Sequence, residues 1–310
     1  MTPGYDKALY LLPFDHRNSY LSGLFDFKRP LTASQSEQVR DSKQLNYEGF
    51  IQAVSGGVPT ESAGVLVDQE FGSDILRDAR RRGFVTAMSI EQSGSDEFEF
   101  EHGAEFFRHI ETFDPTFANV LVRYNPEGDT ALNRRQAGRL KMLSDHCQHS
   151  QRPFMFELLV PATRDQLARM GDSKALYDRR LRPTLMCMAI RHLQDAGVEP
   201  DVWKVEGLSR KDDCERIVAA ARHDGRGAVG CIVLGRGDDV ARVRRWLTTA
   251  AKVQGFIGFA VGRTTFWDAV AAYRAQTMTR AQAVDQIARR LREWVDIFEQ
   301  ARLSRAVPVQ

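Results

Sequence analysis

Two charged residues in otherwise apolar segments have the types and positions needed for covalent chemistry. Lys204 lies in the middle of the segment 202–206, and Glu157 lies within 153–160, where its neighbours are apolar. Burial penalises the ammonium form of a lysine and so favours the neutral amine, which is the nucleophile of Schiff-base chemistry. A carboxylate beside that amine can act as general acid and base. The alternative is a structural salt bridge of Lys204, either with Glu157 or with Glu206.

Two sequences that combine glycine and arginine predict an anion-binding site. Gly235-Arg236-Gly237 and Gly262-Arg263 each follow an apolar segment. Glycine lets the backbone approach a phosphate closely, and an arginine supplies charge-assisted hydrogen bonds. Each sequence alone also fits a tight turn beside a surface arginine, so the prediction depends on their equivalent positions.

Acidic residues near other segment ends raise the alternative of a metal centre. Asp68 and Glu70, together with Asp15, His16 or Glu91, could form a centre of the kind used by metal-dependent aldolases and isomerases. No HxH or HxxxH spacing accompanies them, and only His16 of the seven histidines lies at the end of an apolar segment. We therefore expect no metal and no other cofactor.

The pattern of the whole chain predicts how these residues meet. Short apolar segments alternate with longer amphipathic ones, and no Pro/Gly/Ser-rich linker interrupts them. The strands are predicted at 8–15, 63–68, 84–90, 118–124, 153–160, 201–206, 229–234 and 256–261. The helices are predicted at 35–54, 73–82, 103–112, 130–149, 178–196, 211–223, 238–251, 265–275 and 280–303. This alternation predicts an α/β protein with one (β/α)8 TIM-barrel domain over residues 1–310, and only secondarily an open, doubly wound sheet.

In such a barrel, catalytic groups lie at the carboxyl ends of the strands. Asp15 and Arg17 fall at the end of the first predicted strand, and Arg123 falls at the end of the fourth. Alternation points Lys204 into the barrel, and Glu157 on the preceding strand is expected to face it across the lumen.

Composition and charge narrow the class of protein. The 310-residue chain has a net charge of +2, and its basic residues are scattered, which argues against nucleic acid as a partner. The short apolar run 9–12 meets Pro13 and Asp15, so it predicts neither a signal peptide nor a membrane span. The four cysteines form no CxxC pair and suit the reduced thiols of a cytoplasmic protein.

The last predicted helix has an apolar face that includes Trp294, Val295 and Phe298. This spacing is typical of a helix that packs against the body of its own domain. A contact between two copies in a homo-oligomer is the alternative use of the same face.

Taken together, the sequence resembles the LacD-type class I aldolases, whose best-known members cleave tagatose 1,6-bisphosphate. The matching segments are 14–17, 67–72, the strand with Glu157, 202–206 and 262–263. A closer resemblance covers nearly the whole chain. It is to the aldolase-like domain that follows the sugar kinase in some bacterial 5-dehydro-2-deoxygluconokinases of inositol catabolism. The segments 121–129 and 230–237 carry this second resemblance.

The resemblance implies a (β/α)8 barrel in which Lys204 forms the Schiff base and Glu157 is the acid and base. It also implies that Arg263 helps to hold phosphate and that Asp15 and Arg17 lie in the pocket. One residue departs from the LacD pattern, because Asn119 occupies a position on the fourth strand where those enzymes carry a further active-site lysine. Either Arg123 on the same face supplies the missing charge, or the activity has changed.

The function expected from these observations is a metal-independent class I aldolase that acts on a small-molecule sugar phosphate. The best candidate substrate is 2-deoxy-5-keto-gluconate 6-phosphate, cleaved to dihydroxyacetone phosphate and malonic semialdehyde. Its phosphate is expected at 235–237 and 262–263, and its carboxylate at Arg17 and Arg123. The alternatives are a tagatose-bisphosphate-type or other sugar-phosphate aldolase, a metal-dependent enzyme, and a non-catalytic barrel that binds a sugar phosphate and supports a kinase.

Overall fold

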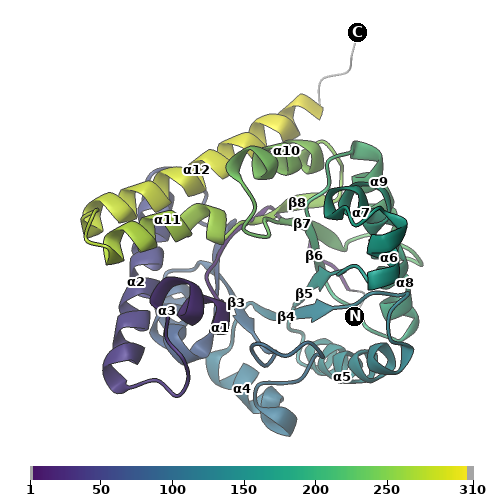
Figure 1. Cartoon of the computed structure of the whole chain (residues 1–310), viewed down its shortest axis with the longest axis horizontal. Coiled ribbons are helices and arrows are strands. Elements are labelled where there is room, and N and C mark those ends of the chain that lie inside the picture. Colours follow the sequence, from purple (N-terminus) through teal and green to yellow (C-terminus); the bar gives the residue numbers. More distant parts are fainter. Residues whose placement is uncertain (1–2, 306–310) are drawn as a thin grey trace.

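Eight parallel strands close into a barrel in the computed structural model, which describes residues 3–305 (Figure 1). Each strand pairs with the next one in the chain, and β8 pairs with β1, so the sheet has no open edge. The predicted (β/α)8 fold is confirmed. The strands are β1 (Leu9–Pro13), β2 (Ala63–Val67), β3 (Val85–Ser89), β4 (Phe117–Arg123), β5 (Phe154–Leu159), β6 (Val202–Glu206), β7 (Gly230–Leu234) and β8 (Phe256–Ala260).

Helices surround the ring of strands on its outside, and most of them occupy segments predicted to be helical (Figure 1). The α-helices are α1 (Asn18–Tyr20), α2 (Ala33–Ser55), α3 (Gln69–Arg81), α4 (Phe106–Phe113), α5 (Thr130–His149), α6 (Arg164–Arg169), α7 (Lys174–Arg180), α8 (Arg182–Asp195), α9 (Lys211–Ala221), α10 (Val240–Ala251), α11 (Arg263–Arg274) and α12 (Arg280–Arg305). Two short turns complete the set, a π-helical one at η1 (Leu21–Phe25) and a 3-10 one at η2 (Gly103–Glu105).

The connection between β5 and α8 differs from the sequence prediction. A single helix was expected at 178–196, but the structure ends α7 at Arg180 and begins α8 at Arg182, with Pro183 in its first turn. Proline suits the first turn of a helix and not its interior, which accounts for the break. α6 and α7 have only six and seven residues, too few for a clear helical period in the sequence.

The apolar core of the protein consists of two layers, one outside the ring of strands and one inside it. One layer lies between the strands and the helices, and the other fills the part of the interior nearer the amino ends of the strands. The inner layer consists of Leu9, Leu11, Leu66, Val85, Ala87, Phe117, Met155, Val202, Ile232 and Ala260. Because alternate residues face the interior, Glu157 and Lys204 follow two positions after Met155 and Val202 and lie at the carboxyl end of this layer.

The last helix packs along one side of the barrel. Figure 1 shows α12 running past α10 and α11, and α12 also contacts α2. Trp294 and Phe298 are fully buried there, and Trp294 Nε1 donates a hydrogen bond to Thr265 Oγ1 at 3.1 Å. The predicted packing face is confirmed. None of the helices between residues 3 and 305 combines the length and apolar composition needed to cross a membrane.

The burial of Trp294 predicts a large effect on stability. Trp294→Ala removes a buried indole and its hydrogen bond, so we expect the free energy of unfolding in urea to fall by about 3–5 kcal/mol. Arg289→Ala on the same helix is the matched control, because the Arg289 side chain is 66% exposed. That change should stay within about 0.5 kcal/mol. Equal losses in the two variants would contradict the packing role of Trp294.

Candidate active site

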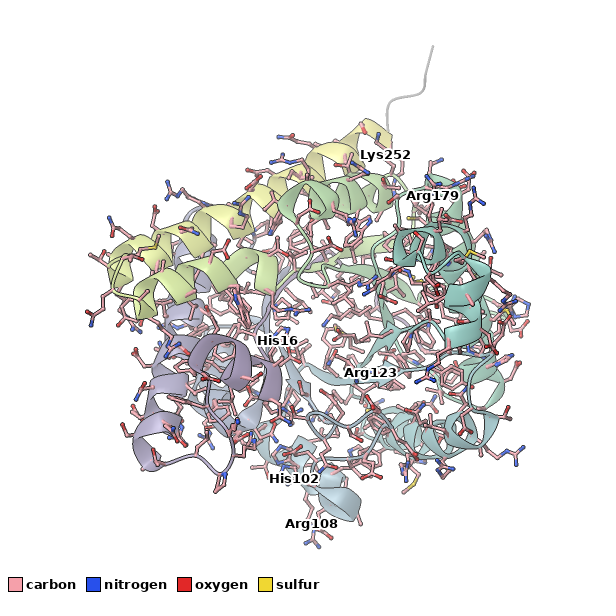
Figure 2. The ribbon with its side chains drawn as sticks, viewed as in Figure 1. His16, His102, Arg108, Arg123, Arg179 and Lys252 are labelled. Atoms are coloured by element: carbon pink, nitrogen blue, oxygen red, sulfur yellow. The ribbon has the colours of Figure 1, made fainter. Side chains whose placement is uncertain are left out.

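A cavity of about 750 Å³ opens at the carboxyl ends of the strands. Every site residue predicted from the sequence borders it. These residues are Asp15, Arg17, Arg123, Glu157, Lys204, Gly235, Arg236, Gly237, Gly262 and Arg263. Figure 2 shows His16 and Arg123 on either side of the barrel opening, whereas Arg108, Arg179 and Lys252 lie at the periphery. The fold therefore gathers groups from β1, β4, β5, β6, β7 and β8 at one place.

Lys204 and Glu157 form a direct contact at the base of this cavity. Their strands pair in register, so that Glu157 lies beside Lys204, and Nζ is 2.5 Å from Glu157 Oε2. Lys204 is 1% exposed and Glu157 is 5% exposed. The sequence predicts that they face each other across the lumen. The structure instead places the two side chains next to each other, because β5 and β6 are adjacent strands. The amine and the carboxylate can exchange a proton without an intermediary.

The surroundings shift the pKa values of Glu157 and Asp15 in opposite directions. Burial raises the pKa of Glu157, and the attraction of Lys204 only partly opposes the rise. Burial also acts to raise the pKa of Asp15, but His16 when protonated and Lys204 attract its carboxylate. Ser89 Oγ donates a hydrogen bond to Asp15 Oδ2 at 2.8 Å, and the net effect is a lowered pKa. Carboxyl groups with such opposed shifts suit separate roles as acid and base.

His16 and the two acidic residues after β2 have partners of their own. Burial lowers the pKa of His16 to about 4, so its imidazole is neutral at pH 7. Asp68 pairs with the fully buried Lys43, which also donates to the backbone oxygen of His16 at 3.1 Å. Glu70 pairs with Arg29 at 2.6 Å. Cations thus satisfy two of the carboxylates considered as metal ligands, and residues 3–305 contain no group of three His, Cys, Asp or Glu side chains arranged to hold a metal ion.

Arg17 borders the cavity but is already bound by carboxylates. It is 3% exposed, and its Nη2 donates to the Glu91 backbone oxygen at 2.6 Å. Its guanidinium also lies 3.4 Å from Glu91 Oε1 and 3.0 Å from Glu101 Oε2. The sequence prediction treats Arg17 as a free ligand for a substrate carboxylate, and the structure differs because Glu101 pairs with its guanidinium and the backbone oxygen of Glu91 accepts a hydrogen bond from it.

The loop after β7 holds its arginine in a similar way. Arg236 has φ of 55° and Gly237 has φ of 72°, so two successive residues adopt the left-handed conformation. This turn directs Arg236 Nη1 to within 3.2 Å of Asp178 Oδ2 and 3.1 Å of Glu206 Oε1. Arg236 thus anchors the loop to its neighbours, which differs from the free phosphate ligand expected from the sequence.

The loop after β8 leaves a group available to an anion. α11 begins at Arg263 and has Gly262 as its N-cap, so no side chain caps the first N–H groups of this helix. Arg263 donates to the backbone oxygen of Arg236 and packs over Gly237, where an added Cβ would lie 2.6 Å from Arg263 Nε. A helix N-terminus beside an exposed arginine suits a phosphate.

Asn119 lies on the barrel interior but does not border the cavity. It pairs along the sheet with Ser89 and Met155, and it is fully buried. Neither its Oδ1 nor its Nδ2 has a hydrogen-bond partner among the described residues. Asn119 is therefore a buried polar group within the barrel, on the amino-terminal side of the cavity residue Leu121.

Three residues that the sequence did not indicate also border the cavity. Lys174, Tyr177 and Asp178 come from α7, whose first four residues precede the helix predicted at 178–196. Their spacing of three and four residues is the signal that a correct helix boundary would have revealed, because it places all three on one helical face.

A family model described as "Uncharacterized protein conserved in bacteria (DUF2090)" matches residues 3–302. The chain belongs to this DUF2090 family. No curated protein matches the sequence.

Solved structures share the barrel of this DUF2090 protein. The fructose-bisphosphate aldolase of Plasmodium falciparum is 10% identical, with a TM-score of 0.60 over 94% of this chain and 91% of that one. An archaeal fructose 1,6-bisphosphate aldolase is 11% identical, with a TM-score of 0.58 over 95% and 94%. A Schiff base forming fructose-1,6-bisphosphate aldolase is 12% identical, with a TM-score of 0.56 over 94% of both chains. At this identity the likeness shows the fold alone.

Glu91 makes the stability of the protein depend on pH. Burial raises the pKa of Glu91 from 4.5 to about 8, although the Arg17 guanidinium opposes the rise. The folded protein therefore keeps a proton that the unfolded chain has lost, and the stability that this proton provides falls as the pH rises from about 4.5 through 8. In Glu91→Gln that loss should be absent.

The measurement is urea unfolding of both proteins at about pH 5, 7 and 9. The free energy of unfolding of Glu91→Gln, relative to wild type, should rise with pH. A difference that stays constant with pH would show that Glu91 is ionised throughout.

Proposed function

We propose that this DUF2090 protein is a class I aldolase that cleaves a sugar phosphate through a Schiff base on Lys204. The observation that carries the proposal is the 2.5 Å contact between the buried Lys204 amine and Glu157 at the base of an open cavity. A site that only binds a sugar phosphate has no need for a buried amine next to an acid. The barrel shared with a Schiff base forming aldolase supports the same chemistry.

The first half of the proposed reaction forms the imine. Glu157 accepts a proton from Lys204, and the raised pKa of this glutamate favours that transfer. The neutral amine then adds to the substrate ketone to give a carbinolamine. Glu157 returns the proton to the carbinolamine oxygen, which leaves as water, and the nitrogen lone pair forms the iminium.

The second half breaks the carbon–carbon bond. Asp15, whose lowered pKa keeps it ionised, takes the proton of the β-hydroxyl. The bonding electrons move to the iminium, which releases an aldehyde and leaves an enamine on Lys204. Protonation of the enamine carbon and addition of water then release the ketone and restore the amine. The water used here balances the water lost earlier, so the net reaction is cleavage alone.

Within this class, we propose that the substrate is a phosphorylated keto sugar acid, 2-deoxy-5-keto-gluconate 6-phosphate. Arg263 and the start of α11 follow β8, two strands from β6, and border the same cavity as Lys204, which suits a phosphate beside the ketone that Lys204 attacks. The resemblance to the domain from inositol catabolism supports this choice. Faster cleavage of tagatose 1,6-bisphosphate than of the keto acid phosphate would assign the tagatose-type activity instead.

Reductive trapping tests the proposed covalent residue. Borohydride added with dihydroxyacetone phosphate should attach the ligand to the peptide that contains Lys204, as detected by mass spectrometry. Lys204→Met should lose both the label and turnover. Lys211→Met is the matched control, because Lys211 is an exposed lysine of the following helix and should keep both. Labelling that persists in Lys204→Met would assign the Schiff base elsewhere, and no labelling of wild type would favour a barrel that binds without catalysis.

Glu157→Gln tests the acid and base role separately from binding. The amide keeps the shape of the side chain but cannot accept or return a proton. We therefore expect kcat to fall about 10²–10⁴-fold, with little change in the dissociation constant of dihydroxyacetone phosphate. A change in KM alone, with kcat preserved, would make Glu157 a positioning residue.

A further inference from the structure

The cations around the cavity divide into two groups according to their partners. Arg17 is bound by Glu101 and by the backbone oxygen of Glu91, and Arg236 is bound by two carboxylates. Arg123 and Arg263 are exposed, and each donates only to a backbone oxygen, of Ser95 and of Arg236 respectively. Lys174 is exposed and has no carboxylate within salt-bridge distance in the part of the chain that the structure describes. Three cations thus remain free to bind a ligand.

α7 holds Lys174 at the cavity rim. Ser173 caps the helix by accepting a hydrogen bond from Leu176 N at 3.2 Å. One turn after Lys174, Tyr177 donates to the backbone oxygen of Val160 at 2.8 Å. The next residue, Asp178, pairs with arginines of α8 and of the β7 loop. These contacts fix the helical face from which Lys174 projects, so its ammonium is limited to the rim.

Lys174 and Arg123 both border the cavity near the end of β5. Tyr177 ties α7 to Val160, which directly follows β5. Arg123 pairs along the sheet with Leu159, the last residue of β5. Both cations therefore flank the end of β5, whereas Arg263 stands after β8. Arg123 stands on β4, four strands around the ring from β8 and from the arginine proposed to hold the phosphate. α7 bridges the end of β5 and the loop after β7, because its Asp178 also pairs with Arg236.

We infer that Lys174 and Arg123 form a second anion-binding subsite, which holds the anionic end of the substrate that is farther from the phosphate. This inference rests on the proposed function and deepens it by naming the residues that select the substrate. A planar guanidinium from β4 and a mobile ammonium from α7 can bind one carboxylate from two directions. The same charges would also accept a second phosphate, so the ligand class is an anion at the far end of a phosphorylated sugar.

The test compares two variants that remove one positive charge from the same helix. Lys174→Met removes the cation at the rim, and Arg179→Met is the control, because Arg179 does not border the cavity and lies at the periphery in Figure 2. Each change is combined with Lys204→Met, which prevents the reaction, and calorimetry measures the binding of two ligands. The ligands are 2-deoxy-5-keto-gluconate 6-phosphate and dihydroxyacetone phosphate, which lacks the far anion.

Lys174→Met should weaken the keto acid phosphate about tenfold and leave dihydroxyacetone phosphate unchanged. Arg179→Met should weaken neither ligand, and Lys174→Arg should retain most of the affinity. In the protein with Lys204 intact, Lys174→Met should raise KM for the keto acid phosphate far more than it lowers kcat. Selective weakening of a ketose bisphosphate by Lys174→Met would support the subsite with phosphate as its ligand.

Two results would overturn the inference. They are equal weakening of both ligands by Lys174→Met, and no weakening of the keto acid phosphate when wild type still traps a Schiff base at Lys204. The second result would leave the proposed reaction intact. Conversely, Lys174→Met could weaken only the keto acid phosphate while wild type shows no borohydride trapping. That result would support the subsite and contradict the aldolase proposal, so the two failures are distinguishable.

Discussion

The desolvated contact between Lys204 and Glu157 is the constraint on which the arrangement of the barrel interior depends. Removing two opposite charges from water is costly unless each retains a close partner, and the in-register pairing of β5 and β6 provides that partner. Asp15, which accepts a hydrogen bond from Ser89, lies at the same end of the barrel and attracts the charge of Lys204. Apolar side chains fill only the opposite end, so one interior serves both as a core and as a reaction site.

Further buried ion pairs connect the strand ends to the loops around the cavity. Glu206 binds arginines from α8 and from the loop after β7, and Lys43 binds Asp68 at the start of α3. Arg17 joins the loop after β1 to the segment after β3. Each pair fixes a loop that would otherwise move relative to the strands. The charges that stabilise the loops are therefore satisfied within the protein, whereas Arg123, Lys174 and Arg263 border the cavity without an acidic partner among the described residues.

The sequence predicted the barrel well because its strands and longer helices carry a clear hydrophobic period. It also placed Lys204, Glu157 and Arg263 correctly at one cavity, since strand ends of a parallel barrel converge. It could not show that Arg17 and Arg236 already have acidic partners, because Glu206, Asp178 and Glu101 lie 30 to 84 positions away from these arginines. It also missed Lys174, because α7 is shorter than two turns and begins before the start of the helix predicted at 178–196.

The apolar layer inside the barrel has a consequence for the order of events at the site. Leu11, Phe117, Met155 and the other side chains of that layer are almost entirely buried and block the route toward the amino ends of the strands. The cavity is thus closed at its inner end, so that a ligand enters and leaves through the same opening. In a cleavage reaction, the fragment tethered at the closed end can depart only after the fragment nearer the mouth. In the proposed aldolase reaction, the free aldehyde would therefore leave first, because the ketone fragment is still bound to Lys204 at the closed end.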